Sequence, residues 1–117
     1  MKNGQPFPAP AVTRGLLDLG SDISVVASRI LTQLGLPVLQ TATTQGVSGS
    51  ATVNLFEVSL SVMGLNVPGA PVLELPQSIV MEAPQALPGI EVLIGLDVLR
   101  KCLLVSDGPG QQFTLAF

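Results

Sequence analysis

The sequence predicts a single all-β domain spanning residues 1–117: a barrel-like sheet with one short helix close to the C-terminal end. Two observations support this prediction. Short apolar segments, several with the alternation of strands, recur along the chain, and turn-forming residues, among them 12 glycines and 10 prolines, separate them. Hydrophobic residues make up 47% of the chain and charged residues 11%, so we expect strands buried on both faces or a sizeable subunit interface.

The elements follow in chain order from this alternation and from the turns. Residues 1–11 are proline-rich and therefore extended and poorly suited to a central strand. A helix-like segment covers residues 27–34 and ends before Gly35, and the short C-terminal helix covers residues 97–101. An interruption of the alternation near Phe56-Glu57 indicates a bulge. The predicted strands are residues 12–18, 23–27, 39–45, 51–62, 70–75, 92–94, 103–105 and 113–117.

The composition excludes several classes of function. Because the chain has no histidine, it cannot perform Ser-His-Asp or Cys-His catalysis by itself, and a zinc site is not expected. A net charge of −3, with five Lys and Arg residues and no Tyr or Trp, argues against nucleic-acid binding. The single cysteine, Cys102, excludes an intrachain disulfide, and its apolar neighbours predict a small core residue.

Nothing in the sequence indicates a membrane or secreted protein. No apolar run approaches the roughly 20 residues that a helix needs to span a bilayer. The N-terminal residues lack the apolar core of a signal peptide. We therefore expect a cytoplasmic location, or a domain of a longer protein, and no contact with a membrane.

The most informative segment is residues 15–22, in which an apolar run delivers Asp18 into a Gly-Ser turn. Burying an unpaired charge is costly, so an Asp at the end of a buried strand, followed by a glycine that admits another backbone, is a candidate for chemistry. By itself the motif also fits an ordinary strand-to-turn junction. A second segment, residues 91–99, repeats the arrangement with an apolar strand, Gly95 and Asp97 before a short helix.

With both segments in view, the chain resembles the retropepsin-like aspartic proteases, above all their bacterial single-domain members. The resemblance rests on the Asp-x-Gly-Ser motif and on the runs at residues 93–99, 102–105 and 113–117, and it covers roughly residues 14–117. It implies a closed retropepsin-like β-barrel with one short C-terminal helix, which is one half of the acid protease fold. It also implies an endopeptidase that hydrolyses peptide bonds in extended polypeptides.

Hydrolysis of a peptide without a metal needs a water molecule, a base that activates it and a proton donor. Two carboxylates that share one proton supply both roles, and no cofactor is needed. Because the chain has one Asp-x-Gly-Ser motif, the second carboxylate has to come from another subunit. We therefore expect a homodimer with the Asp18 pair on its two-fold axis. By resemblance, Asp97, which follows Ile94 and Gly95, caps or braces the helix and does not reach the centre.

The resemblance implies supporting roles around Asp18. Gly20 would give room for close approach and offer its amide to the carboxylate, and Ser21 could hydrogen-bond the outer carboxylate oxygen. Ser24 is expected to be an ordinary polar position, because no base lies beside it in the sequence. The residues alone slightly favour a plain hairpin turn for the loop at residues 46–50, whereas the resemblance implies that this loop is the flap that closes over the substrate. The flap residues are Gly46, Val47, Ser48, Gly49 and Ser50.

The sequence departs from the family pattern in three places. Leu19 stands where the family usually has Thr or Ser, whose hydroxyl bonds across the dimer, and Leu96 stands where related sequences often have Arg. The usual first strand is missing ahead of Asn3-Gly4, which is typical of a hairpin turn. These departures leave two alternatives open: a retropepsin-shaped protein that binds peptides or a partner without cleaving, and a monomeric fragment that truncation has inactivated.

Overall fold

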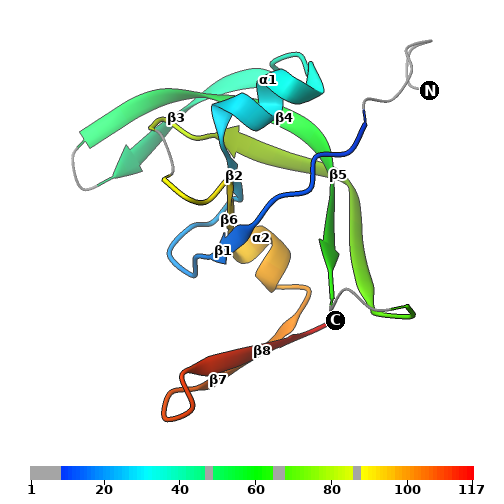
Figure 1. The fold of residues 1–117 in the computed structure, drawn as a ribbon. Coiled ribbons are helices and arrows are strands. Elements are labelled where there is room, and N and C mark those ends of the chain that lie inside the picture. Colours follow the sequence, from blue (N-terminus) through cyan, green and yellow to red (C-terminus); the bar gives the residue numbers. More distant parts are fainter. Residues whose placement is uncertain (1–8, 47–48, 65–67, 86–87) are drawn as a thin grey trace.

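The computed structural model describes residues 9–46, 49–64, 68–85 and 88–117. Its strands are β1 (Gly15–Leu17), β2 (Val25–Val26), β3 (Gln40–Gly46), β4 (Gly49–Met63), β5 (Val72–Glu82), β6 (Val92–Ile94), β7 (Leu103–Asp107) and β8 (Gln112–Ala116), and its helices are α1 (Ser28–Leu34) and α2 (Leu96–Leu99). The predicted all-β class is confirmed (Figure 1). Within these ranges, neither helix is long and apolar enough to cross a membrane.

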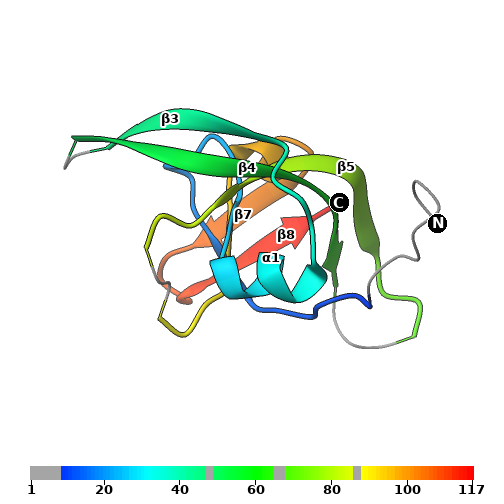
Figure 2. The same cartoon turned by 90° about the horizontal axis from the view of Figure 1, so that it is seen from above.

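The main sheet has six strands in the order β1-β6-β2-β5-β4-β3, and it curls into a half-barrel (Figures 1 and 2). The sheet is open, with β1 and β3 at its edges, so the prediction of a closed barrel was wrong for the described residues. The C-terminal hairpin explains the difference. β7 and β8 pair with each other, lie beyond α2, and add no strand to the main sheet.

The long central strands β4 and β5 bend together, and the bend contains a bulge. The register of their pairing changes between Val58 and Leu60, where two residues of β5, one of them Pro76, lie opposite one residue of β4. A proline is tolerated there because a bulged residue donates no ladder hydrogen bond. The strand predicted over residues 70–75 therefore continues to the end of β5. The bulge expected near Phe56-Glu57 lies slightly further along the strand.

Short strands in the middle of the sheet connect the two halves of the chain. β6 lies between β1 and β2, parallel to the first and antiparallel to the second, and β2 also runs parallel to β5. Leu17 pairs with Ile94, so β1 and β6 end side by side. The strands predicted over residues 12–18 and 23–27 are shorter in the structure, because the chain leaves the sheet around a loop at residues 18–24, hereafter the Asp18 loop.

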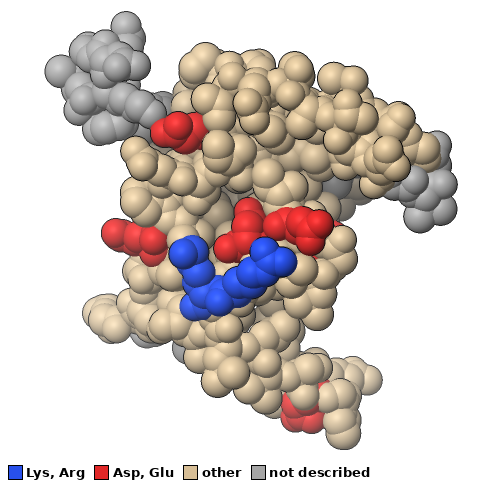
Figure 3. All heavy atoms as spheres, turned by 180° about the vertical axis from the view of Figure 1, so that it is seen from behind, with Lys and Arg blue, Asp and Glu red and all other residues tan. Residues whose placement is uncertain are grey.

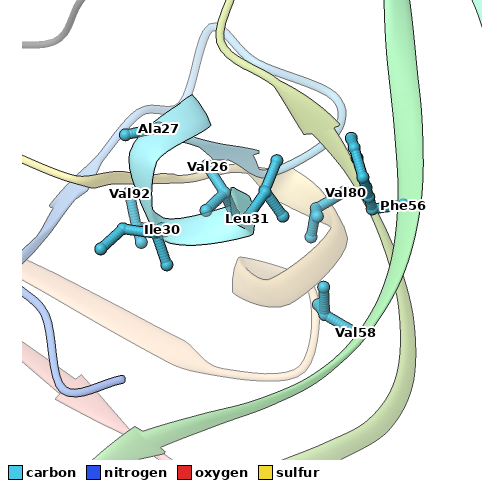
Figure 4. Close-up of a cluster of buried hydrophobic side chains, with 8 residues drawn as sticks. All are labelled: Val26, Ala27, Ile30, Leu31, Phe56, Val58, Val80 and Val92. Carbon is cyan, nitrogen blue, oxygen red and sulfur yellow. The ribbon is translucent and has the colours of Figure 1, made fainter. Parts of the chain in front are cut away.

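The hydrophobic core lies between α1 and the main sheet (Figure 4). Leu31 of α1 is 2% exposed and lies beside Val26 and the fully buried Val80. Burying a side chain of this size contributes about 1.5–3 kcal/mol. The helix ends as predicted at Gly35, whose φ of 67° is left-handed. The core cluster consists of Val26, Ala27, Ile30, Leu31, Phe56, Val58, Val80 and Val92.

Candidate active site

Asp18 lies directly after β1 and is partly buried. Its N–H donates a hydrogen bond to the carbonyl of Ile94 at 2.9 Å, which extends the contact between β1 and β6 beyond the last pair of strand residues. The N–H of Gly20 donates to Asp18 Oδ1 at 2.9 Å, so the predicted contact between this amide and the carboxylate is present. Within the described ranges, the second oxygen, Oδ2, accepts no hydrogen bond.

The residues on either side of Gly20 have different surroundings. Leu19 is 61% exposed, so its side chain projects from the Asp18 loop into solvent. Ser21 Oγ donates a hydrogen bond of 2.6 Å to the carbonyl of Ile23. The predicted bond from Ser21 to the Asp18 carboxylate is therefore not formed. The loop turns so that the backbone carbonyl two residues ahead satisfies the hydroxyl, as serine commonly does in turns.

The Asp18 loop is held against the segment that follows β6. The N–H of Leu96 donates to the carbonyl of Ser21 at 2.8 Å, and the N–H of Asp97 donates to the carbonyl of Asp22 at 3.2 Å. These bonds join the two motifs that look like related halves in the sequence. The fold therefore places the two motifs in contact with each other, and Asp18 lies at the edge of this contact.

Gly95 lies at a close approach between these two segments and is buried. A Cβ at this position would be 2.7 Å from the carbonyl oxygen of Ser21 and 2.9 Å from the carbonyl carbon and oxygen of Ile23. The colliding atoms belong to the backbone and cannot rotate away as the end of a side chain can. The glycine of the second motif therefore allows the Asp18 loop to pack directly on the start of α2.

Ser24 joins the two motifs through hydrogen bonds, a role that the sequence did not predict. It is fully buried, and its Oγ donates to Asp97 Oδ1 at 2.8 Å and accepts from the N–H of Gly95 at 3.0 Å. The expectation of an ordinary polar position was wrong. A usable signal exists: Ser24 stands between the apolar residues Ile23 and Val25, directly before β2, both of whose residues are buried, and a buried hydroxyl needs hydrogen-bond partners.

Asp97 braces the start of α2, as expected. Its Oδ1 accepts from the N–H of Val98 at 2.9 Å in the first helical turn, where a negative charge is favourable. Its Oδ2 accepts from the backbone N–H of Ser24 at 3.0 Å. Both oxygens of Asp97 are thus occupied, whereas Asp18 has one oxygen that accepts no hydrogen bond within the described ranges.

The hairpin loop predicted to be a flap joins β3 to β4. Gly46 pairs with Gly49, so the strands stay paired up to the loop, and Ser50 lies in the next pair. Gly49 has a φ of 117°, a conformation that favours glycine. Val47 and Ser48 lie outside the described residues. The outer ends of β3 and β4 lie on the same side of the molecule as the Asp18 loop (Figures 1 and 2).

A pocket of about 360 Å³ lies next to the Asp18 loop, between α2 and β5. Its lining combines the charged side chains of Asp22, Asp97 and Lys101 with apolar side chains such as that of Ile79. Figure 3 shows Lys and Arg side chains beside Asp and Glu side chains in the middle of one face. Asp18 does not line this pocket, so the pocket is separate from the predicted catalytic position.

Among the residues that the structure describes, the thiol and the carboxylates do not form a metal site. Cys102 is partly buried, and its Sγ donates to the carbonyl of Val98 at 3.6 Å. Burial raises the pKa of the Cys102 thiol, which keeps it protonated and unreactive at neutral pH. No group of three or more Cys, Asp or Glu side chains in the described part of the chain is arranged to hold a metal ion.

The described residues therefore place the Asp18 carboxylate, with one amide donor to it, beside two motifs that are joined by hydrogen bonds. General acid–base hydrolysis by carboxyl groups needs two of them. No protein-family model matches the sequence, and no curated protein matches it significantly.

Proposed function

We propose that this protein is a retropepsin-like aspartic endopeptidase that acts as a homodimer on extended polypeptides. The observation that carries the proposal is the setting of Asp18. Its carboxylate lies at the end of a strand and receives one hydrogen bond from Gly20, and its second oxygen is available to another group. The order of the two motifs in the sequence supports the same assignment.

In the proposed reaction, the Asp18 carboxyl groups of two subunits face each other across a two-fold axis. Two carboxylates about 3 Å apart do not both ionise, so the pair holds one proton. The ionised group takes a proton from a water molecule that attacks the carbonyl carbon of the peptide. The protonated group gives its proton to the carbonyl oxygen, which forms a tetrahedral intermediate with two hydroxyl groups. The first group then passes the proton it took from water to the amide nitrogen, and the second takes a proton from one of the hydroxyl groups. The C–N bond breaks, which releases one product with a new amine and one with a new carboxylic acid and restores the shared proton of the pair.

An exposed apolar side chain beside Asp18 supports the pairing of two subunits. Leu16 is 51% exposed, so an interface here would remove apolar surface from water. The β7–β8 hairpin supports the same conclusion. A two-stranded sheet alone is marginally stable in water, and this one exposes Leu103 to 65% and Phe113 to 58%. We infer that both surfaces lie in the subunit interface.

The β3–β4 hairpin is the proposed flap over the substrate. Its paired strands extend on the side of the Asp18 loop, and a loop there would hydrogen-bond the backbone of an extended peptide. Closure of such a loop excludes water from the reacting bond. Recognition through backbone groups suits a substrate that is an unfolded or extended polypeptide.

The leucine at position 19 favours a second function. The hydroxyl that the family usually has at this position bonds across the dimer, and a leucine cannot form that bond. An unmade buried hydrogen bond costs about 1–3 kcal/mol, and the dimer would lack two of them. The alternative is therefore a retropepsin-shaped protein that binds peptides beneath the same hairpin without cleaving them.

The test is cleavage of a mixture of reduced, carboxymethylated proteins between pH 4 and 7, followed by mass spectrometry. Asp18→Asn keeps the size of the side chain and removes the ionisable group. Glu74→Gln is the matched control, because it changes the net charge equally at an exposed position of β5. We expect cleavage by the wild type and Glu74→Gln, and none by Asp18→Asn.

Each other outcome has a defined meaning. Cleavage that persists in Asp18→Asn refutes the assignment of the catalytic carboxylate. A folded wild type that binds unfolded chains without cleaving them supports the peptide-binding alternative. A protein that neither cleaves nor binds, and that is monomeric at micromolar concentration, supports an inactive fragment.

A further inference from the structure

Ser24 and Asp97 form a buried connection between the two motifs. Ser24 Oγ donates to Asp97 Oδ1 at 2.8 Å, and the backbone N–H of Ser24 donates to Asp97 Oδ2 at 3.0 Å. The two residues are 73 positions apart in the chain. Ser24 has no exposed surface, and its Oγ also accepts from the N–H of Gly95 at 3.0 Å. Hydrogen bonds to an ionised carboxylate are about twice as strong as neutral ones.

This connection fixes one end of the Asp18 loop. The other end is fixed by the bond of 2.9 Å from the N–H of Asp18 to the carbonyl of Ile94. Between the two ends, the carbonyl groups of Ser21 and Asp22 accept from the segment that starts α2. A loop held at both ends and in its middle has little freedom, and the Gly20 amide is thereby kept 2.9 Å from Asp18 Oδ1.

We propose that Ser24 and Asp97 are positioning residues for the Asp18 carboxylate, acting as a clamp that holds the Asp18 loop on the start of α2. The inference rests on the proposed function for its effect on catalysis, and on the structure alone for its effect on the loop. Neither residue is catalytic. Ser24 is inaccessible, and both oxygens of Asp97 are occupied by Ser24 and Val98.

The substitutions that test the clamp differ in one group each. Ser24→Ala removes the hydroxyl and leaves the N–H of Gly95 without its partner. Asp97→Asn keeps the shape, but because both oxygens accept hydrogen bonds, its NH2 group faces a donor whichever way it turns. Ser24→Thr keeps the hydroxyl and serves as the conservative rescue. Ser59→Ala, on an exposed position of β4, is the matched control.

Two readouts are measured well below the melting temperature of each variant. The first is kcat and KM on a quenched peptide that contains a wild-type cleavage site. The second is the NMR signal and exchange rate of the Gly20 amide proton, which reports the bond to Asp18 without any need for activity. For Ser24→Ala and Asp97→Asn, we expect kcat to fall about 10- to 100-fold with little change in KM, as for a misplaced catalytic group. The Gly20 signal should shift and exchange faster in both, and Ser24→Thr and Ser59→Ala should resemble the wild type.

The clamp is overturned if Ser24→Ala and Asp97→Asn lower the melting temperature but leave the Gly20 signal and kcat unchanged, because the contacts would then be merely structural. If Ser24→Ala does not fold, Asp97→Asn alone decides. If the wild type cleaves nothing, the proposed function fails, and the Gly20 signal still decides the clamp: a change in both variants supports it and an unchanged signal overturns it.

Discussion

Replacing Gly95 with alanine should destabilise the fold, although the backbone at this position tolerates any residue. Gly95 has φ −93° and ψ −172°, an extended conformation that alanine adopts freely. The added Cβ would nevertheless lie 2.7 Å from the carbonyl oxygen of Ser21 and 2.9 Å from the carbonyl group of Ile23. Because these are backbone atoms, the Asp18 loop has to move away from the start of α2.

The size of the effect follows from the contacts that this movement disturbs. It stretches the bond of 2.8 Å from Leu96 N to Ser21 O and the bond of 3.0 Å from Gly95 N to Ser24 Oγ. Overpacking typically costs about 1–3 kcal/mol, and weakened buried hydrogen bonds add about 1 kcal/mol. We expect a loss of about 2–4 kcal/mol in unfolding free energy, which for a domain of this size lowers the melting temperature by roughly 8–16 °C.

The assay is thermal unfolding followed by circular dichroism at one fixed protein concentration, because dimerisation makes the melting temperature depend on concentration. Gly108→Ala is the matched control: its φ is not left-handed and its Cβ would meet no atom within 4 Å, so its melting temperature should stay within about 2 °C of the wild type. If Gly95→Ala melts as high as Gly108→Ala, the close packing of the Asp18 loop on α2 is refuted.

Three other predictions concern the dimer and the thiol. Leu19→Thr should lower the Kd of the dimer about tenfold or more, because the threonine hydroxyls supply hydrogen bonds across the axis, and it should raise the rate of cleavage. An unchanged Kd in sedimentation together with an unchanged rate in a peptide assay would contradict the role of position 19. Leu103 is 65% exposed in the single chain, so Leu103→Lys should leave the fold intact and raise the Kd of the dimer about tenfold or more. Val38→Lys, the control, should leave the Kd unchanged. Equal Kd values for the two variants would argue against the hairpin interface. Burial raises the pKa of the Cys102 thiol, so the folded state favours the protonated thiol. The resulting contribution to the free energy of unfolding is present at pH values below the pKa of the thiol in the unfolded chain. It is lost as the pH rises through the higher pKa of the thiol in the folded chain. Thiol-reagent kinetics between pH 7 and 10 should therefore be slower for the folded than for the unfolded chain, and equal rates would contradict the burial.

Elements with local signals could be predicted from the sequence. The helix over residues 27–34 is recognisable because Gly35 ends it in a left-handed conformation. The β3–β4 and β7–β8 hairpins are recognisable because apolar alternation flanks residues that form turns. The place of Asp18 at the end of a strand and its contact with Gly20 also involve neighbouring residues, and both are present in the structure.

Elements that depend on a partner strand could not be predicted in full. The strand predicted over residues 70–75 continues through Pro76 in β5, because the pairing with β4 places this proline in a bulge that no local signal marks. The half-barrel is open because β7 and β8 pair with each other instead of extending the sheet, a choice between partners that the apolar pattern leaves undetermined.

The sequence by itself determined what depends on nearest neighbours: the β class, the helix and hairpin boundaries, the Asp18 turn, and the exclusion of histidine chemistry. The tertiary structure decided which residues meet across long stretches of chain. Gly95 packs against the backbone of Ser21 and Ile23, and Ser24 binds Asp97 at a separation of 73 residues. Such contacts depend on the path of the whole sheet, because local propensity fixes how a segment turns and only strand pairing fixes which segment it meets.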